Sequence, residues 1–235
     1  RQRQMCIRDS YIRALLSKGK AVITANKDII ADAGIELIQT AKENNACLYF
    51  EAAVAAGIPV LKPLIESLRG EELSKVLGII NGTSNYMLTA MEEGSSYEDA
   101  LSTAQELGYA EPDPTNDVEG IDAKYKAVIL SLLCFGVSPS SDELFTDGIS
   151  EITKEDFEWA ARLGKTIKLV AQIDNKNGFN ARVHPVLIDT KHPLAAIRGA
   201  LNAVVVEGDN INQLVFSGPG AGAEPTASAI IGDVL

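Results

Sequence analysis

The sequence predicts two structural parts: an α/β layer, then an α+β domain with a mixed or antiparallel sheet covered by helices. Residues 11–58 alternate helix, strand, helix and strand with short connections, a pattern typical of parallel strands joined by a right-handed crossover. Strand-like runs then crowd the second half of the chain. Because the pattern changes at Gly57-Ile58-Pro59, we expect the second part to begin near Pro59. The 235 residues leave room for two small domains.

The predicted α/β layer has four elements. Residues 11–20 predict a short helix, and residues 21–26 form a β-branched apolar run that is typical of a buried strand. Apolar residues recur at helical spacing over residues 28–45, and residues 47–54 predict a second strand. The preceding decapeptide, residues 1–10, matches no pattern and is treated as foreign or unassigned sequence.

Prolines, glycines and capping residues divide the second part. Ser96 and Asp99 are spaced as a capping box at the start of a helix, and the segment 108–120, with two prolines, predicts a loop. Trp159 lies in a predicted helix, where we expect it in the core. Helices are expected at residues 60–70, 85–93, 96–107, 121–135, 155–163 and 225–235, and strands at 75–81, 167–174, 180–188, 200–209 and 212–218.

Composition excludes several classes of partner. The chain has 21 Lys+Arg and 32 Asp+Glu, a formal net charge of −11 that is spread along its length, which argues against a nucleic-acid partner or an anionic membrane surface. Its apolar runs are far shorter than the roughly 20 residues of a membrane helix. The three cysteines lie far apart, which indicates neither a zinc site nor a disulfide framework. We therefore expect a cytoplasmic protein.

The acidic loop before residue 121 leads into a candidate catalytic pair. Glu111 lies in this loop, and Asp122 and Lys126 are four residues apart in the helix that follows, so they share one helix face. The plain alternative is a solvated acidic loop followed by an exposed ion pair. However, the same face continues into apolar residues, and burying either charge alone is costly. A lysine beside a carboxylate can deliver a proton to a developing alkoxide, which suits carbonyl reduction or its reverse.

Two further segments lie at the ends of the predicted strands of the α/β layer. Lys27 follows the strand 21–26, a position where ligands bind in open α/β sheets, although a solvated lysine in the first turn of a helix is the commoner explanation. The segment Glu51–Pro59 ends a strand in small residues. Such a segment can direct successive carbonyl oxygens at a hard cation, but tight packing is more frequent.

A glycine-rich loop occupies residues 218–223, between a predicted strand and the last predicted helix. Its sequence, GPGAGA, formally matches the dinucleotide fingerprint GxGxxG/A, but it contains a proline and the chain shows no second strand after it. We interpret it as a loop whose backbone can approach a bound ligand closely, and not as the primary phosphate-binding turn.

Taken together and in order, these segments resemble the homoserine dehydrogenase family. The matching text is AVITANKDII, YFEAAVAAGIPVLKPL, GIINGTSNYML, LGYAEPDPTNDVEGIDAKYK, RVHPVLI with HPLA, and GPGAGAEPTASAIIGD. The resemblance implies a Rossmann-type nucleotide-binding layer, present here in part, and a catalytic and dimerisation domain. It further implies the NADP- or NAD-dependent interconversion of L-aspartate 4-semialdehyde and L-homoserine, in threonine and methionine biosynthesis, by a homodimer.

The resemblance also implies roles for individual residues. Lys126 would be the proton donor, and Asp122 would orient it and, with Glu111, hold the substrate. Gly108 would border substrate and nicotinamide, while Lys27 and Gly222 would contact the cofactor. A sodium ion would be bound largely by main-chain oxygens, at Glu51, Val54, Ala56 and Ile58.

The resemblance also predicts how the chain is divided and where it departs from the family. We expect residues 1–10 to be unassigned, 11–58 to be the C-terminal part of the nucleotide-binding domain, 59–215 the catalytic and dimerisation domain, and 216–235 a return to the nucleotide-binding domain. The strand and GxGxxG turn that open the family's nucleotide-binding domain are expected to be missing, so the chain as given is expected to be inactive. Two alternatives stay open: a non-catalytic dimerising or regulatory module, and a dehydrogenase of another amino-acid semialdehyde.

Overall fold

The computed structural model describes residues 10–235, and its first part is a small parallel sheet with flanking helices. Strands β1 (Val22–Ile23) and β2 (Leu48–Tyr49) pair in parallel and are connected through helix α2 (Lys27–Glu43). The predicted helix–strand–helix–strand order and the parallel pairing are therefore confirmed. The interpretation of the N-terminal decapeptide concerns residues that lie, except for Ser10, outside the described part.

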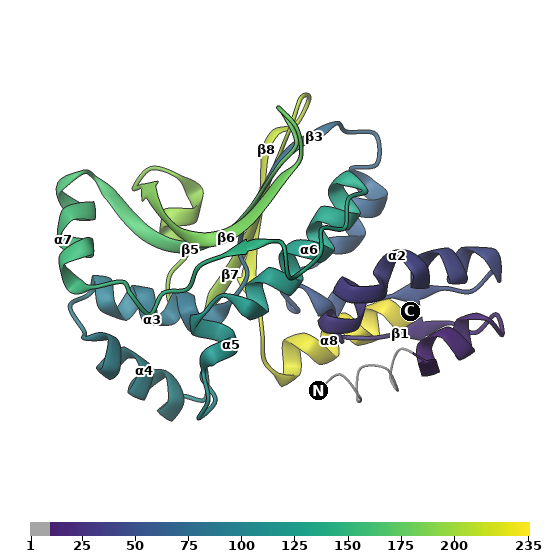
Figure 1. Cartoon of the computed structure of the whole chain (residues 1–235), viewed down its shortest axis with the longest axis horizontal. Coiled ribbons are helices and arrows are strands. Elements are labelled where there is room, and N and C mark those ends of the chain that lie inside the picture. The colour runs from purple at the N-terminus through teal and green to yellow at the C-terminus, as the bar shows by residue number, and fades with distance from the viewer. Residues whose placement is uncertain (1–9) are drawn as a thin grey trace.

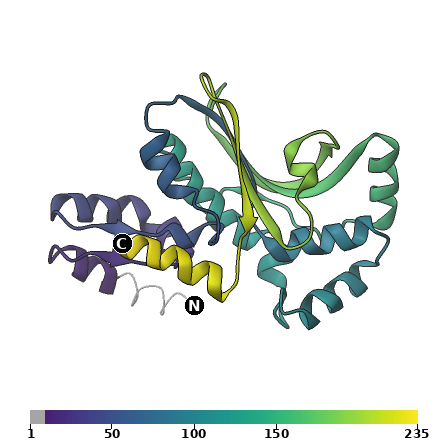
Figure 2. The ribbon, with the colours of Figure 1, turned by 180° about the vertical axis from the view of Figure 1, so that it is seen from behind.

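The last helix of the chain returns to this first part. Helix α8 (Ala223–Val234) packs against β1 and against the short 3-10 helix η1 (Glu51–Ala53). In Figures 1 and 2 this yellow helix lies beside the purple N-terminal elements. The predicted strand 47–54 is too long, because the chain turns after Tyr49. The Glu51 carboxylate stabilises this turn by accepting hydrogen bonds from the backbone N–H groups of Val60, Leu61 and Lys62, at 2.7, 2.7 and 2.8 Å.

The second part is built on a six-stranded mixed sheet with the order β4-β6-β5-β3-β7-β8. All neighbouring pairs are antiparallel except β4 with β6. The predicted mixed sheet is thus confirmed. The strands are β3 (Leu73–Ile79), β4 (Phe145–Thr146), β5 (Lys165–Asp174), β6 (Asn180–Asp189), β7 (Leu201–Gly208) and β8 (Asn212–Pro219).

Helices cover one face of the large sheet and connect it to the first part. Helices α3 (Gly82–Glu92) and α6 (Ile121–Phe135) pack on β5, and α6 also contacts α2, so α6 joins the two parts of the molecule (Figure 1). The main core lies between these helices and the sheet. The opposite sheet face buries a smaller cluster, including Val205, beneath the segment that contains η3 (Pro193–Ala196). The remaining helical segments are residues 10–16, η2 (Pro63–Ser67), α4 (Tyr97–Glu106), α5 (Thr115–Val118) and α7 (Lys154–Arg162).

Three local predictions need correction. The segment 108–120 is not all loop, because α5 forms within it. The predicted helix 60–70 contains π-helical η2 at its centre. Trp159 is 61% exposed and not part of the core, because α7 buries Phe157 and Ala160 and turns the indole outward, where the Arg162 guanidinium lies 4.6 Å from the ring centre. Among residues 10–235 no helix has the length and apolar composition that a bilayer crossing needs.

Candidate active site

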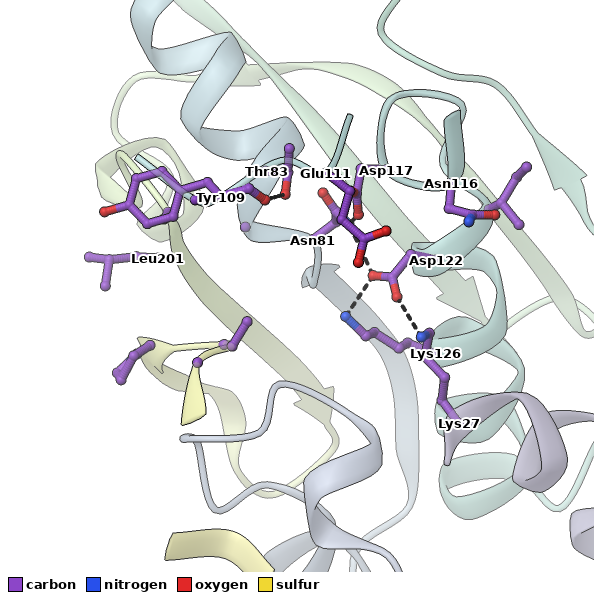
Figure 3. Close-up of a pocket in the computed structure, with 18 of the residues that line it drawn as sticks. Lys27, Asn81, Thr83, Tyr109, Glu111, Asn116, Asp117, Asp122, Lys126 and Leu201 are labelled. Atoms are coloured by element: carbon purple, nitrogen blue, oxygen red, sulfur yellow. Dashed lines mark hydrogen bonds and ion pairs between the residues drawn. The ribbon is translucent and has the colours of Figure 1, made fainter. Parts of the chain in front are cut away.

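A cavity of about 860 Å³ lies where the two parts of the molecule meet, and all six residues predicted for catalysis and for substrate or cofactor binding line it. This volume suits a small ligand together with part of a larger one. The cavity also borders the first residues of α3, the 198–201 segment and the glycine-rich loop (Figure 3). The predicted lining residues are Lys27, Gly108, Glu111, Asp122, Lys126 and Gly222.

Asp122 is the centre of the charged part of the cavity. Its Oδ2 accepts a hydrogen bond from Lys126 Nζ at 2.7 Å, and its Oδ1 lies 3.1 Å from Lys27 Nζ (Figure 3). Asn81 Nδ2 donates to the same carboxylate at 3.0 Å. Lys126 also donates to the carbonyl oxygen of Ile80, at 2.7 Å. One largely buried carboxylate is therefore shared between two ammonium groups, and the Lys126 side chain is held both at Asp122 and at the residue directly after β3.

Local backbone geometry brings these side chains together. Gly120 adopts a left-handed conformation (φ +73°) directly before α6, so Asp122 falls in the first turn of that helix and Lys126 one turn later. Lys27 is the first residue of α2 and follows β1 closely. The side chain of Asn81, which caps α3, accepts from the backbone N–H of Ser84 at 2.8 Å. Helix starts thus place Asp122, Lys27 and Asn81, and Lys126 follows Asp122 by one turn of α6.

The charges of the cluster determine its protonation. Burial alone would raise the pKa of Asp122, but the charges of Lys126 and Lys27 and the hydrogen bonds from Lys126 and Asn81 lower it to about 2. Burial alone would lower the pKa of Lys27, but the charge and hydrogen bond of Asp122 raise it above its ordinary value. Burial raises the pKa of Asp117, with a further contribution from the nearby negative charge of Asp122. At neutral pH Asp122 is therefore an anion that stabilises two cations.

Several cavity residues were not predicted as functional. Asn81 connects two carboxylates, since its Nδ2 also donates to Asp117 Oδ1 at 2.7 Å. Thr83 donates through Oγ1 to the carbonyl oxygen of Tyr109, and both residues line the cavity. The available signal was the segment NGTSN, residues 81–85, at the end of the predicted strand 75–81, because polar residues at a strand end are well placed for a ligand.

The glycine-rich loop forms another side of the cavity, as its interpretation as a ligand-approaching loop requires. Gly220 packs directly on the buried side chain of Asn202, and a Cβ at this position would lie 1.9 Å from Asn202 Nδ2. Gly222 has φ +118° and precedes α8, a conformation that L side chains rarely adopt. Only glycine at both positions allows the backbone to follow this path along the cavity.

The residues predicted to bind sodium lie elsewhere, in the turn after β2. Val54, Ala56 and Ile58 are buried, and within the described part of the chain no backbone N–H donates to their carbonyl oxygens. Free carbonyl oxygens of this kind fit a cation held by the main chain. The carboxylate of Glu51 is already engaged by three backbone N–H groups. Its carbonyl oxygen accepts from the N–H of Val54 at 3.5 Å, which leaves a second lone pair for such a role. Residues 10–235 contain no cluster of three or more His, Cys, Asp or Glu side chains suited to a metal.

Comparison with known proteins identifies the family. The homoserine dehydrogenase family model matches residues 59–235. The chain is 46% identical over 228 residues to homoserine dehydrogenase of Lactococcus lactis, covering 96% of this chain and 53% of that protein. The crystal structure of a homoserine dehydrogenase from Thiobacillus denitrificans superimposes with a TM-score of 0.91 at 44% identity, over 95% of this chain and 52% of that one.

A further solved relative carries a cofactor. It is a hyperthermophilic archaeal homoserine dehydrogenase in complex with NADPH, with a TM-score of 0.84 and 34% identity, matched over 96% of this chain and 66% of the relative. The fold of this chain thus matches that of oxidoreductases of which one was solved with NADPH. The chain belongs to the homoserine dehydrogenase family. It spans about half the length of the curated relatives it matches.

Proposed function

We propose that this chain carries the catalytic site of an NAD(P)-dependent homoserine dehydrogenase, which interconverts L-aspartate 4-semialdehyde and L-homoserine. The observation that carries the proposal is the convergence of Lys126, Asp122 and Lys27 with Glu111 on one cavity. A buried ammonium beside a carboxylate suits proton transfer to a carbonyl oxygen. Membership of the family supports this reaction over the alternatives of a non-catalytic module and of a dehydrogenase for another semialdehyde.

In the reduction direction, Lys126 donates a proton to the aldehyde oxygen of the substrate. Asp122 fixes the direction of the Lys126 ammonium through the 2.7 Å hydrogen bond, and the carbonyl oxygen of Ile80 provides a second fixed contact. A bound nicotinamide supplies or accepts the hydride at the substrate carbon. In the reverse direction the neutral amine of Lys126 accepts the proton of the substrate hydroxyl. Lys27, paired with the same carboxylate, borders the substrate and cofactor regions.

The two ends of an amino-acid substrate find complementary groups in the cavity. Glu111 lines it and can accept hydrogen bonds from the substrate ammonium. Gly82 and Thr83 are the first residues of α3 and also line the cavity, and the backbone N–H groups of the first helical turn have no partner within the helix. They suit the substrate carboxylate. Gly108 also lines the cavity, and by the family resemblance it would border both the substrate and the nicotinamide.

The cofactor and cation proposals rest on backbone features. The glycine-rich loop, with Gly222, and the N-terminus of α2, with Lys27, both line the cavity and would border the space proposed for the nicotinamide. NADPH in the archaeal relative supports NADP or NAD as cofactor. A sodium ion on the carbonyl oxygens of Glu51, Val54, Ala56 and Ile58 would have a structural role, because it would hold the turn between β2 and η2. By the same resemblance, the enzyme would act as a homodimer.

The test replaces Lys126 in the full-length protein, in which all activity and affinity measurements below are also made, and compares it with a neighbouring lysine. Lys126→Ala is expected to lower kcat for homoserine oxidation at least about 100-fold, the lower range for loss of a general acid or base, with NADPH affinity unchanged. Lys124→Ala, on the same helix but outside the cavity lining, is the matched control and should keep wild-type kcat. NADPH fluorescence titration verifies cofactor binding before turnover is measured. Near-normal turnover by Lys126→Ala would refute the proposal.

A further inference from the structure

A fully buried lysine lies behind the cavity, outside the charged cluster. Lys168 is on β5, is only 1% exposed, and has mostly apolar neighbours along the strand. Burying an ammonium group is costly, and an apolar side chain of similar length would fill the same space without this cost. The presence of a lysine at this buried position therefore needs a structural or functional reason.

Lys168 and Asn85 form a hydrogen-bonded pair. Lys168 Nζ donates to the carbonyl oxygen of Ile197 at 2.7 Å and to Asn85 Oδ1 at 3.3 Å. With its oxygen facing the ammonium, the Asn85 amide turns its Nδ2 toward the carbonyl oxygens of Ile197, Gly199 and Leu201, at 3.2, 2.9 and 3.0 Å. Lys168 thus sets the direction in which Asn85 donates.

Two of the three carbonyl groups that Asn85 contacts, those of Gly199 and Leu201, belong to one side of the catalytic cavity, and Ile197 directly precedes that side. Residues 198–201 all line the cavity, and we name this segment the 198–201 wall. Figure 3 shows Leu201 on the side of the cavity opposite to Lys126. A third hydrogen bond holds the wall, since the N–H of Gly199 donates to Thr89 Oγ1 at 3.1 Å. Side chains of α3 and β5 therefore determine the path of the wall.

The wall also contacts the start of α3. A Cβ at Gly82 would lie 2.8 Å from the carbonyl oxygen of Ala200, so the wall backbone packs directly against the first residue of α3. Asn85 is one helical turn beyond Asn81, whose side chain donates to Asp122. A single helix thus connects the central carboxylate to the wall on the opposite side of the cavity.

We propose that Lys168 and Asn85 are positioning residues of the active site, which hold the 198–201 wall at the distance from Lys126 that fits the amino-acid substrate. The inference rests on the proposed function, because it assigns the wall to the substrate side of the same cavity. Neither side chain contacts the reacting atoms. Their loss should weaken substrate binding more than it lowers kcat.

The first experiment measures whether the wall is held, and it needs no ligand. Hydrogen–deuterium exchange is compared for wild type, Lys168→Met, Thr89→Val and the control Lys165→Met, a lysine on the same strand but outside the network. We expect faster exchange at residues 197–201 in Lys168→Met and Thr89→Val only. Unchanged exchange there in both would refute the holding role. Thr89→Val removes one acceptor with little change of volume, so it tests the wall even if Lys168→Met fails to fold.

The second experiment measures homoserine and cofactor affinity in the same variants, by calorimetry and by steady-state kinetics. We expect the dissociation constant and KM for homoserine to rise at least fivefold in Lys168→Met and Thr89→Val, with kcat within threefold and NADPH affinity unchanged. A double variant Lys168→Met/Asn85→Leu should lose little more than Lys168→Met alone, because both act through the same wall. Faster exchange with unchanged homoserine affinity would overturn the positioning role. If wild type itself does not bind homoserine, the proposed function fails, while the exchange data still decide whether Lys168 holds the wall.

Discussion

Asp122→Asn keeps the shape of the central side chain and removes its charge, so it tests the arrangement of the site directly. The carboxylate uses both oxygens: Oδ1 faces Lys27 at 3.1 Å, and Oδ2 accepts from Lys126 at 2.7 Å and from Asn81 at 3.0 Å. An amide has a single oxygen, so its NH₂ group must face at least one of these donors. The variant leaves two ammonium groups in the cavity with no carboxylate between them.

The pKa of Asp122 indicates how much stability the Asp122→Asn variant should lose. Its fall from 3.8 to about 2 means that the folded state stabilises the ionised form by about 2 kcal/mol after the cost of burial. The side chains of Asp122 and Lys126 are only 12% and 13% exposed, so solvent screens the pair little. Removing one partner of a buried pair costs about 3–5 kcal/mol. We therefore expect the free energy of unfolding at pH 7 to fall by about 2–4 kcal/mol and kcat by about 100-fold or more.

The dependence on pH follows from the direction of the shift. A carboxyl group with a lowered pKa stabilises the folded state above its unfolded value of 3.8, and this stabilisation is lost as pH falls toward about 2. Urea unfolding of wild type and Asp122→Asn should therefore differ by a constant amount between about pH 5 and 8, and the difference should shrink below about pH 4. Kinetics with homoserine are measured on the same preparations.

Two results would refute this reasoning. A stability difference that stays constant down to pH 2 would mean that the charge of Asp122 is not the stabilising feature. A kcat within threefold of wild type would mean that the carboxylate does not orient Lys126. Asp117→Asn gives a graded comparison in the same cavity, because Asp117 accepts from Asn81 and forms no ion pair with either lysine. The loss of kcat in Asp117→Asn should be smaller than the loss in Asp122→Asn.

Three other predictions test separate parts of the structure. Gly220→Ala places a methyl group 1.9 Å from Asn202 Nδ2, so it should displace the glycine-rich loop and weaken NADPH binding in a fluorescence titration; unchanged affinity would contradict the packing. Burial lowers the pKa of Lys168 to about 8; the charge of Glu92 opposes this shift and that of Arg198 adds to it. In urea unfolding, the stability of wild type relative to Lys168→Met should therefore rise between about pH 8 and 10.5, by up to about 3 kcal/mol. A stability difference that does not change with pH would argue against a buried ammonium. Burial raises the pKa of Cys134 to about 12, so iodoacetamide at pH 8 should label exposed Cys47 and leave Cys134 unmodified by mass spectrometry; comparable labelling would exclude this burial.

Much of the fold is encoded in local patterns that the sequence displays. The helix 121–135 was predicted with its actual bounds, because glycines precede and follow a continuous run of helix-forming residues. The parallel pair β1 and β2 followed from the strand–helix–strand order. The prediction that Trp159 lies in the core was wrong. The sequence of α7 has more than one apolar residue, and only the position of the sheet decides which of them is buried.

The candidate site was predicted in part for a comparable reason. Asp122 and Lys126 are four residues apart, so helical geometry alone brings them together. The contact of Lys27 with Asp122 joins residues 95 positions apart, and the resemblance to the family indicated only their common neighbourhood. Asn81 and Lys168 were not predicted as site residues, because an asparagine at the end of a strand and a lysine within a strand are both common in protein sequences. Their importance comes from the carboxylates and carbonyl groups that the tertiary structure brings to them.

The packing of α8 on the first part of the molecule has a consequence for the order of folding. The side chain of Asp233 accepts from the backbone N–H of Glu51, 182 residues earlier, and forms an ion pair with Lys62 at 3.3 Å. During synthesis, the last contacts of the small parallel sheet can therefore form only after the chain has been made as far as Asp233. Contacts between such distant positions fold slowly and leave apolar surface exposed meanwhile. Within the six-stranded sheet, by contrast, β5 and β6 are adjacent in sequence, so this pair can form before α8 has been synthesised.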